Sequence, residues 1–212
     1  GPDGTRQSLP TIQEIKRTKI RVGFSLLETR SSPPAIKKAI GGLHIDLSAI
    51  AKGFAVDQIS EYLSSIGMEN HLVDIGGEVR SRGTRVDGSP WQVAIEKPKA
   101  NGRRIQRIIR LSNSAIATSG DYRNFFEVDG IRYSHEINPI TAWPITHALA
   151  SVTVLAEDCT MADAWSTALM ILGPDEGYEM AIEERLAALF IVTSGEAFIE
   201  KATPLFPNLA EL

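Results

Sequence analysis

Hydrophobic residues recur along the chain with two different periods, and each period predicts one type of element. A spacing of three to four residues is typical of a helix with one buried face. This spacing predicts helices over Thr11–Lys19, Ser48–Ile66, the stretch from Cys159 to the Gly173-Pro174 stop, and Glu176–Ala187. The predicted buried stripe of the second helix consists of Ile50, Phe54, Ile59, Leu63 and Ile66. That of the third consists of Met161, Ala164, Trp165, Ala168, Leu169 and Leu172.

Shorter stretches, rich in β-branched residues or alternating between apolar and polar positions, predict strands. They cover Lys19–Leu27, His71–Ile75, Trp91–Ile95, Ile105–Leu111, Ala150–Ala156 and Leu189–Val192. Two more, Phe125–Val128 and Ile131–Tyr133, flank Asp129-Gly130, which is a strong signal for a two-residue hairpin. Because hairpin and meander signals favour antiparallel pairing, we predict an α+β fold with a mostly antiparallel sheet and packed helices.

The composition narrows the possible classes of protein. A chain of 212 residues that is 43% hydrophobic and 23% charged fits one globular domain, or two small ones sharing a core. The formal net charge of −4 argues against a non-specific nucleic-acid binder, which would normally carry a basic stripe. With Cys159 as the single cysteine, neither an internal disulfide nor a cysteine-rich metal site is possible.

Asp163 and Thr167 stand four residues apart in the third predicted helix, so both lie on one face about one turn apart. A carboxylate and a hydroxyl are hard oxygen donors of the kind that Mg²⁺ and Ca²⁺ prefer. The alternative is purely structural, with Asp163 favouring the helix macrodipole and Thr167 bonding back to a carbonyl. An early-turn position of this kind is expected to face the surface.

Two segments before this helix combine small residues with charges. In Asp46-Leu-Ser-Ala-Ile-Ala-Lys-Gly53, small residues at a helix start permit a close approach to an anion, and Lys52 could neutralise a phosphate. A capped surface helix with a solvated lysine explains the same residues. In Asp74-Ile-Gly-Gly-Glu78, the paired glycines allow either a ligand approach or an ordinary turn, and the turn is the better interpretation.

Two later segments are weaker candidates when taken alone. Ala117-Thr-Ser-Gly-Asp-Tyr122 places hydroxyls beside a glycine, which predicts a phosphate or cofactor loop, although many turns share this composition. His135 precedes the turn at Asn138-Pro139 and is a candidate proton carrier near neutral pH. The alternative for His135 is a solvated or core histidine.

Together these segments resemble the ApbE family, the FAD:protein FMN transferases. The string from Asp46 to Asp57 carries most of the resemblance, and the other segments follow in the family's order. They are Asp74-Ile-Gly-Gly, Trp91–Ile95, Ala117–Tyr122, His135–Pro144 and Ala162–Thr167, so that the resemblance runs from Asp46 to Gly173 at least. It implies one ApbE-like domain over residues 1–212, corresponding to the C-terminal two-thirds of the family domain.

The resemblance implies an Mg²⁺-dependent transfer of FMN from FAD to a threonine or serine of a target flavoprotein, with release of AMP. It assigns the metal to Asp163, Thr167 and the carbonyl of Ala49. It assigns FAD contacts to Asp46, Lys52, Thr118, Ser119, Gly120 and Ile137. His135 would help to activate the acceptor hydroxyl.

The chain departs from the family pattern at several positions. Asn138 replaces the usual aspartate before proline, Ala142 replaces a glycine after Thr141, and Ser48 and Ala49 replace glycines. Asn138 removes a charge, which weakens the case for a second acidic group near His135.

The chain starts at Gly1-Pro-Asp-Gly4, like the middle of a family loop. We therefore expect an N-terminal part of the family domain to be missing here, and FAD binding by residues 1–212 alone to be weak. By resemblance, the protein is expected in the periplasm, and a lipid anchor on that missing part is expected to tether it to the inner membrane. Two other functions stay open, namely FAD hydrolysis to FMN and AMP at the same site, and a non-catalytic flavin-binding module.

Overall fold

The structure is a computed structural model of the chain and describes residues 9–99, 102, 104–121, 125–128, 131–195 and 197–207. The chain divides into two compact units. One comprises residues 47–124 and 147–212, and the other comprises residues 1–46 and 125–146. We call them the sheet unit and the hairpin unit and describe each by itself. The prediction of one transferase domain over residues 1–212 stays a prediction.

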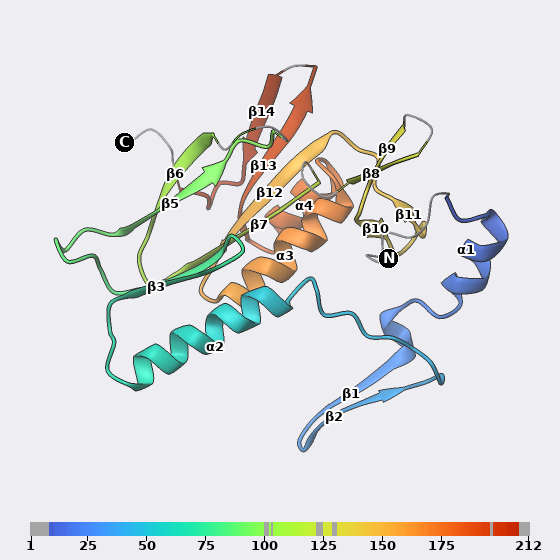
Figure 1. Ribbon diagram of the computed structural model, residues 1–212, viewed down its shortest axis with the longest axis horizontal. Helices are drawn as coiled ribbons and strands as arrows, with labels where there is room; N and C mark the ends of the chain where they lie inside the picture. Colours follow the sequence, from blue (N-terminus) through green and yellow to red (C-terminus); the bar gives the residue numbers. More distant parts are fainter. Residues whose placement is uncertain are drawn as a thin grey trace. The chain divides into compact units, whose positions relative to one another are not determined.

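The sheet unit is built on a six-stranded sheet with the order β14-β13-β12-β7-β4-β3, in which every neighbouring pair is antiparallel (Figure 1). Its strands are β3 (His71–Ile75), β4 (Glu78–Arg82), β7 (Ala115–Gly120), β12 (Leu149–Ala156), β13 (Ala187–Ser194) and β14 (Ala197–Ala202). The sequence predicted β3, β12 and β13. The mostly antiparallel α+β fold is confirmed.

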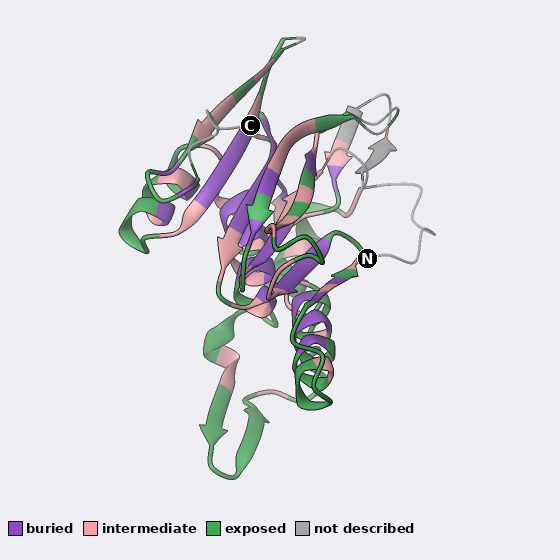
Figure 2. Ribbon diagram, turned by 90° about the vertical axis from the view of Figure 1, so that its left-hand side faces the viewer, coloured by how far each residue is buried: buried purple, intermediate pink, exposed green. Residues whose placement is uncertain are grey.

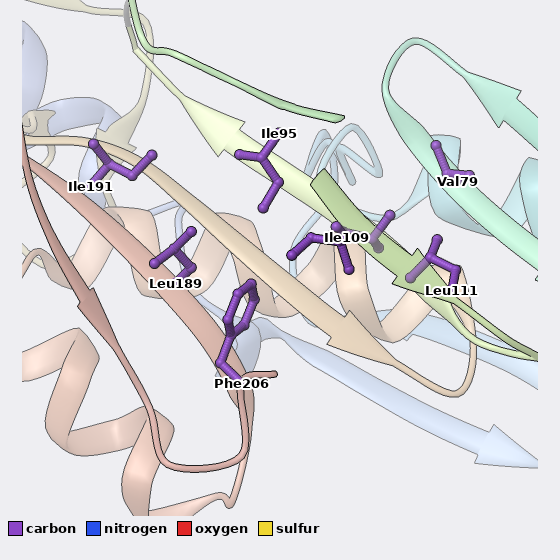
Figure 3. Packing of buried hydrophobic residues seen from close by; sticks show 8 residues of the cluster. Val79, Ile95, Ile109, Leu111, Leu189, Ile191 and Phe206 are labelled. Carbon is purple, nitrogen blue, oxygen red and sulfur yellow. The ribbon is translucent and has the colours of Figure 1, made fainter. Parts of the chain in front are cut away.

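A separate hairpin of β5 (Trp91–Glu96) and β6 (Ile105–Leu111) covers one face of this sheet. Its residues Ile95, Ile109 and Leu111 pack in one cluster with residues of the sheet (Figure 3). The sheet residues of the cluster are Val79, Ile116, Leu189 and Ile191, and Phe206 joins them from the segment after β14. This face is therefore an apolar core. We call it the hairpin side, after the β5–β6 hairpin, which belongs to the sheet unit and not to the hairpin unit.

Three helices cover the other face, which we call the helix side. Helix α2 (Ala51–Ser65) packs on β3 and β4, α3 (Cys159–Leu172) on β7 and β12, and α4 (Glu176–Glu183) beside α3 and β13. Figure 2 shows burial concentrated in the strands and along the inward sides of the helices. Among the described residues, no helix is both long and apolar enough to cross a membrane.

The buried face of α2 differs from the predicted stripe. Its buried residues are Gly53, Val56, Asp57 and Ser60, whereas Phe54, Ile59 and Ile66 are 54%, 44% and 53% exposed. Small and polar residues face inward because α2 lies close to α3 and above charged residues of β4, so large apolar side chains do not fit there. The predicted stripe of α3 is wrong for a similar reason: Asp163 and Ser166 are buried, and Met161 is 46% exposed.

Helix α4 is shorter than predicted. It ends at Glu183, and Arg185 has a φ of 54°, in the left-handed region that an α-helix excludes. Helix α3, in contrast, ends as predicted at Gly173, whose φ of 89° suits glycine.

The hairpin unit consists of small elements. They are α1 (Ile12–Lys19), a 3₁₀ turn (Phe24–Leu26), and three two-stranded pairs: β1 (Leu27–Ser31) with β2 (Pro34–Lys38), β8 (Phe125–Val128) with β9 (Ile131–Ser134), and β10 (Ile137–Asn138) with β11 (Trp143–Pro144). Thr11 and Glu14 form a capping box that starts α1 where it was predicted. The predicted strand Lys19–Leu27 is wrong, because Gly23 turns the chain into the 3₁₀ segment and β1 begins only at Leu27.

Candidate functional site

Asp163 and Thr167 lie on one face of α3, as their spacing predicts. The structure corrects the expected exposure of Asp163, whose exposed fraction is only 2%. Its Oδ2 accepts a hydrogen bond of 2.9 Å from the backbone N–H of Gly53 on α2. Burial raises the pKa of Asp163, and the Gly53 bond and the nearby Lys52 ammonium oppose that shift. Asp163 is therefore a desolvated carboxylate, whose charge a cation would stabilise.

The close approach of α2 and α3 depends on Gly53. A Cβ atom at this position would lie 2.3 Å from the carbonyl oxygen of Cys159 and 2.8 Å from the Cβ of Asp163, so only glycine fits. Because the Gly53 amide donates to Asp163, it does not donate to the carbonyl of Ala49 four residues earlier. The carbonyl of Ala49, one turn before Gly53, therefore does not accept the helical hydrogen bond that the Gly53 amide would otherwise donate to it.

The segment Ala117–Gly120 is part of strand β7, and the predicted phosphate loop is wrong in that respect. Ser119 points to the helix side, where its Oγ lies 2.9 Å from Ser166 Oγ and 3.1 Å from Thr167 Oγ1. Thr118 points to the opposite face, since strand residues alternate, and its Oγ1 lies 2.8 Å from Thr153 Oγ1. Ser119 therefore joins the Asp163–Thr167 face, whereas Thr118 does not. Gly120 ends the strand.

Lys52 projects from the first turn of α2 and pairs with Glu78 at the start of β4, with 2.5 Å between Nζ and Oε1. Glu78 is 2% exposed, and its Oε2 has no hydrogen-bond partner. Burial raises the pKa of Glu78, opposed by Lys52 and reinforced by the charge of Asp163. A buried glutamate thus holds the lysine that was predicted to meet a phosphate.

Sequence reasoning missed Glu78, although it closes the Asp74–Glu78 string. The paired glycines form a two-residue turn between β3 and β4, with φ of 68° at Gly76 and 105° at Gly77, as the turn interpretation predicts. Because Val79 faces the hairpin side, its neighbour Glu78 must face the helices. The alternation of side chains along a strand was therefore the signal that could have placed Glu78 under the helices.

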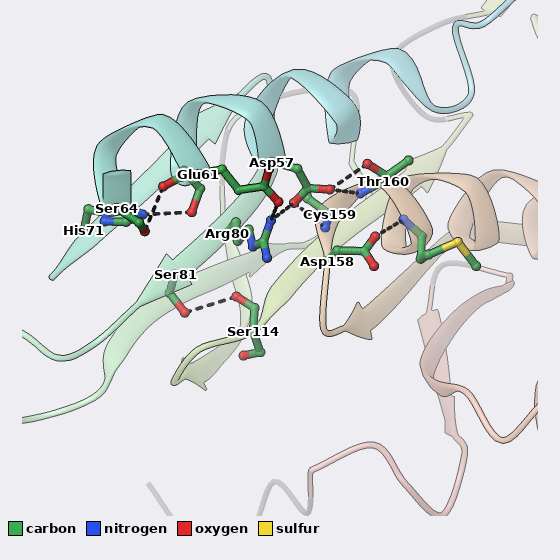
Figure 4. A network of polar contacts seen from close by, with 12 residues as sticks. Asp57, Glu61, Ser64, His71, Arg80, Ser81, Ser114, Asp158, Cys159 and Thr160 are labelled. Atoms are coloured by element: carbon green, nitrogen blue, oxygen red, sulfur yellow. Dashed lines mark hydrogen bonds and ion pairs between the residues drawn. The ribbon is translucent and has the colours of Figure 1, made fainter. Parts of the chain in front are cut away.

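A second ion pair joins α2 to β4, and unlike the first it is buried on both sides. Arg80 donates to Asp57 Oδ1 at 2.7 Å, and both side chains are under 10% exposed (Figure 4). Although burial raises the pKa of Asp57, bonds from Thr160 and Cys159 and the charge of Arg80 outweigh it and lower the pKa overall. Neither residue was predicted as functional.

The hairpin unit carries the remaining candidates, Asp46, His135 and Ile137. Asp46 is exposed and directly precedes the sheet unit in sequence. His135 is exposed at the bend after β9, and Ile137, in β10, is 47% exposed. Asn138, which replaces the expected aspartate, accepts from the amides of Ile140 and Thr141 at 2.8 and 3.2 Å through its Oδ1. The amide oxygen alone is therefore enough to hold the turn.

The donor set on the helix side fits a hard divalent cation. Asp163 supplies a carboxylate and Thr167 a hydroxyl from one face of α3, both oxygen donors, and the carbonyl of Ala49 is the third donor that the family resemblance implies. Within the described ranges no group of three or more His, Cys, Asp or Glu residues is arranged to hold a metal ion.

Comparison with known families and proteins was made with the whole chain. A family model described as "ApbE family" matches residues 1–190. A FAD:protein FMN transferase of Haemophilus influenzae is 41% identical, and the match covers all of this chain and 62% of that protein. One of Vibrio cholerae is 43% identical, with coverage of 97% and 61%. The chain thus spans about three-fifths of the length of these curated relatives.

Solved structures agree with the sequence matches. The flavin transferase ApbE from Vibrio cholerae superposes with a TM-score of 0.85 at 42% identity, covering 97% of this chain and 65% of that one. The apo form of the flavinyl transferase ApbE of Pseudomonas stutzeri gives 0.86 at 39% identity, with coverage of 99% and 64%.

Proposed function

Because the chain belongs to the ApbE family, we propose that it serves in the transfer of FMN from FAD to a hydroxyl group of a target protein. In this reaction, the hydroxyl oxygen bonds to the phosphorus of the FMN half. The pyrophosphate P–O bond breaks, and its electron pair leaves with AMP. The proposal is supported by the activity named for relatives that match 97% or more of this chain.

One observation of the structure carries the proposal, namely the face of α3 on which the oxygen donors Asp163 and Thr167 lie. Asp163 is buried against the Gly53 amide, and Thr167 lies one turn further along the helix beside Ser119. A structural aspartate on a helix usually sits in solvent, whereas Asp163, in the second turn of α3, bonds to a neighbouring helix and is desolvated. Such a carboxylate suits a site where charge is neutralised.

We infer that Mg²⁺ is the cation and that Asp163, Thr167 and the Ala49 carbonyl hold it. When bound, it would neutralise the charge that develops on the phosphates as the pyrophosphate breaks. Lys52, exposed over 48% of its side chain yet anchored by Glu78, is positioned to add a positive charge toward a phosphate.

The other roles rest on the family resemblance. Asp46, Thr118, Ser119, Gly120 and Ile137 are proposed FAD contacts, and Thr118 is the least supported because it faces the hairpin side of the sheet. His135 is proposed to take the proton of the acceptor hydroxyl. The exposure of His135 is compatible with meeting a macromolecular acceptor.

The acceptor is proposed to be a flavoprotein with a threonine or serine at its modification site. A periplasmic location and a lipid anchor are proposed on the same resemblance, and neither enters the argument about the site.

The experiment incubates the chain with MgCl₂, FAD in enough excess to offset the weak binding expected of residues 1–212, and a flavoprotein that carries FMN on threonine, supplied in its unmodified form. Mass spectrometry should show the acceptor gaining FMN with loss of one water, and chromatography should show an equal amount of AMP. AMP and FMN without modified acceptor would instead indicate hydrolysis. FAD left intact, with bound flavin recovered on gel filtration, would indicate a binding module.

His135→Asn is the matched variant for the proton role. It should slow transfer at saturating FAD while leaving FAD affinity unchanged, because the proton carrier acts on the acceptor. A loss of FAD affinity equal to the loss of rate would show that His135 binds FAD and does not carry the proton.

A further inference from the structure

The carboxylate of Asp57, in the middle of α2, is shared among partners from two other elements. Its Oδ1 accepts from the Cys159 N–H at 2.9 Å and from Arg80 at 2.7 Å. Its Oδ2 accepts from the N–H and the Oγ1 of Thr160 at 2.8 and 2.6 Å. Asp57 is 5% exposed, so these four bonds replace its water (Figure 4).

Two of these donors are the first backbone amides of α3. The first amides of a helix have no partner within the helix and are usually capped by a residue just before it. Here the local cap, Asp158, serves only the amide of Met161, at 2.8 Å. The amides of Cys159 and Thr160, which precede that of Met161, instead donate to Asp57 on a different helix. The negative charge of Asp57 is stabilising at the positive end of the α3 dipole. The beginning of α3 is therefore tied to α2.

The residues that form these bonds belong to two rows, one on each helix. On α2 and the turn before it, Ala49, Gly53 and Asp57 are spaced four apart. On α3, Cys159, Asp163 and Thr167 have the same spacing, so each row lies along one helix face. Asp57 meets Cys159 at one end, and Gly53 meets Asp163 in the middle. These two bonds show that the helices run antiparallel, so the same order would place Ala49, in the turn before α2, on the side of Thr167.

We propose that Asp57 is a positioning residue for the cation site: by capping α3 from α2, it sets the register that brings Asp163 and Thr167 to the Ala49 carbonyl. This inference rests on the cation site of the proposed function. Asp57 itself is two turns from Ala49 along α2 and takes no part as a ligand. Outer partners that orient metal ligands typically change affinity by about 10- to 100-fold when they are removed.

The experiment measures Mn²⁺ binding by the loss of the free-ion electron paramagnetic resonance signal when protein is added, without nucleotide, because ADP alone would bind the ion. Asp57→Asn keeps the shape but replaces one acceptor with a donor that faces Thr160 or Arg80. It should weaken Mn²⁺ binding by about 10-fold or more. Thr160→Val removes a single side-chain bond and should weaken binding by a smaller factor. It also keeps the test valid should Asp57→Asn unfold.

Val56→Ala is the matched control, because Val56 is the fully buried neighbour of Asp57 and packs against Cys159 without a polar bond. It should lower the melting temperature yet leave the Mn²⁺ dissociation constant within about twofold. Equal Mn²⁺ affinity of Asp57→Asn and the wild type would overturn the inference, as would equal weakening by Val56→Ala.

The proposed function fails differently. If the wild type and Asp163→Asn bind Mn²⁺ equally, the cation site itself is wrong. If the wild type binds more tightly than Asp163→Asn, the site stands and the Asp57 result decides the inference alone. In transfer assays, excess Mg²⁺ should restore the rate of Asp57→Asn but not that of Asp163→Asn.

Discussion

The two faces of the six-stranded sheet are both buried, but different interactions hold their layers. On the hairpin side, β5 and β6 meet the sheet through aliphatic side chains and Phe206. On the helix side, an apolar cluster that includes Val56, Val73 and Ala115 is joined by two ion pairs between α2 and β4, Lys52–Glu78 and Asp57–Arg80. Strand β4 shows the contrast within three residues, because Val79 points to one face while Glu78 and Arg80 point to the other.

The difference separates stability from chemistry. Apolar packing is non-directional, so the hairpin side can hold the fold together without fixing any one atom. Hydrogen bonds and ion pairs in a desolvated layer fix distances and angles, and they are costly when one partner is lost. We therefore expect substitutions of the paired polar residues on the helix side to affect function first, and substitutions of apolar core residues, including all those of the hairpin-side cluster, to affect stability alone.

The largest expected effect is that of Asp163→Asn on FMN transfer. The amide keeps the shape of the buried carboxylate and can still accept from Gly53, but it removes the charged cation ligand. Transfer should fall by about 100- to 1,000-fold at saturating FAD, comparable to the loss of one preorganised electrostatic contact. Acceptor modification measured by mass spectrometry checks this. A rate within twofold of the wild type would remove Asp163 from the site.

Gly53→Ala should come next and should affect both properties. The added methyl group meets the Cys159 carbonyl, a backbone atom that cannot move without shifting α3. Overpacking of this kind costs about 1–3 kcal/mol or more. Urea unfolding should show the loss, and Mn²⁺ binding should weaken in the folded protein. Unchanged Mn²⁺ affinity would show that the spacing of α2 and α3 does not control the site.

Ile109→Val tests the opposite face with a smaller change. Ile109 is 2% exposed in the hairpin-side cluster, and removing one methyl group there should cost about 1 kcal/mol of unfolding free energy. Mn²⁺ affinity and transfer per folded molecule should stay unchanged. A loss of cation affinity without further loss of stability would mean that the two faces are coupled through the sheet.

The smallest effect should be a difference between Glu78 on β4 and Asp57 on α2 in how their contributions to the free energy of unfolding depend on pH. Because the pKa of Glu78 is raised in the folded state, its proton stabilises the fold below the ordinary value of 4.5, and this contribution is lost as pH rises through the raised pKa. Glu78→Gln should therefore gain stability relative to the wild type as pH rises.

Asp57 should show the reverse trend. Its pKa is lowered in the folded state, so its contribution is present above the ordinary value of 3.8 and is lost as pH falls through the lowered pKa. The deficit of Asp57→Asn should therefore be largest at neutral pH and should shrink in acid. Denaturant titrations at several pH values test both variants, and parallel trends would contradict the assigned directions.

The sequence predicted the positions of helices and strands better than it predicted which face of each helix is buried. The helices α1, α2 and α3 and most strands of the sheet unit follow from periodicity, because each has enough turns or alternations to register. Strands β4, β7 and β14 of the six-stranded sheet were not predicted. The buried stripes of α2 and α3 were wrong because periodicity marks large apolar residues, whereas the interface between these helices is formed by Gly53, Asp57 and Asp163.

The site was predictable to a similar extent. The i, i+4 pair Asp163 and Thr167 identified a shared face of α3, and Ser119 joins it. The partners Glu78, Asp57 and Arg80 were missed because charged residues in strands and helices are usually solvent-exposed, and only the tertiary packing shows that they are buried. The failures that concern buried charge lie at or next to the candidate site, as expected where function constrains the sequence.

The thiol of Cys159 makes the junction of α2 and α3 accessible to measurement. It is the chain's single cysteine, and it is free and fully buried. Burial raises the pKa of the thiol, and the nearby carboxylate of Asp57 raises it further, so the reactive thiolate is suppressed while the helices are docked. An alkylating reagent should therefore modify the native chain only as fast as the helices separate, and its rate would report how often they do. Cysteines introduced on the surface could carry spectroscopic labels with Cys159 left in place.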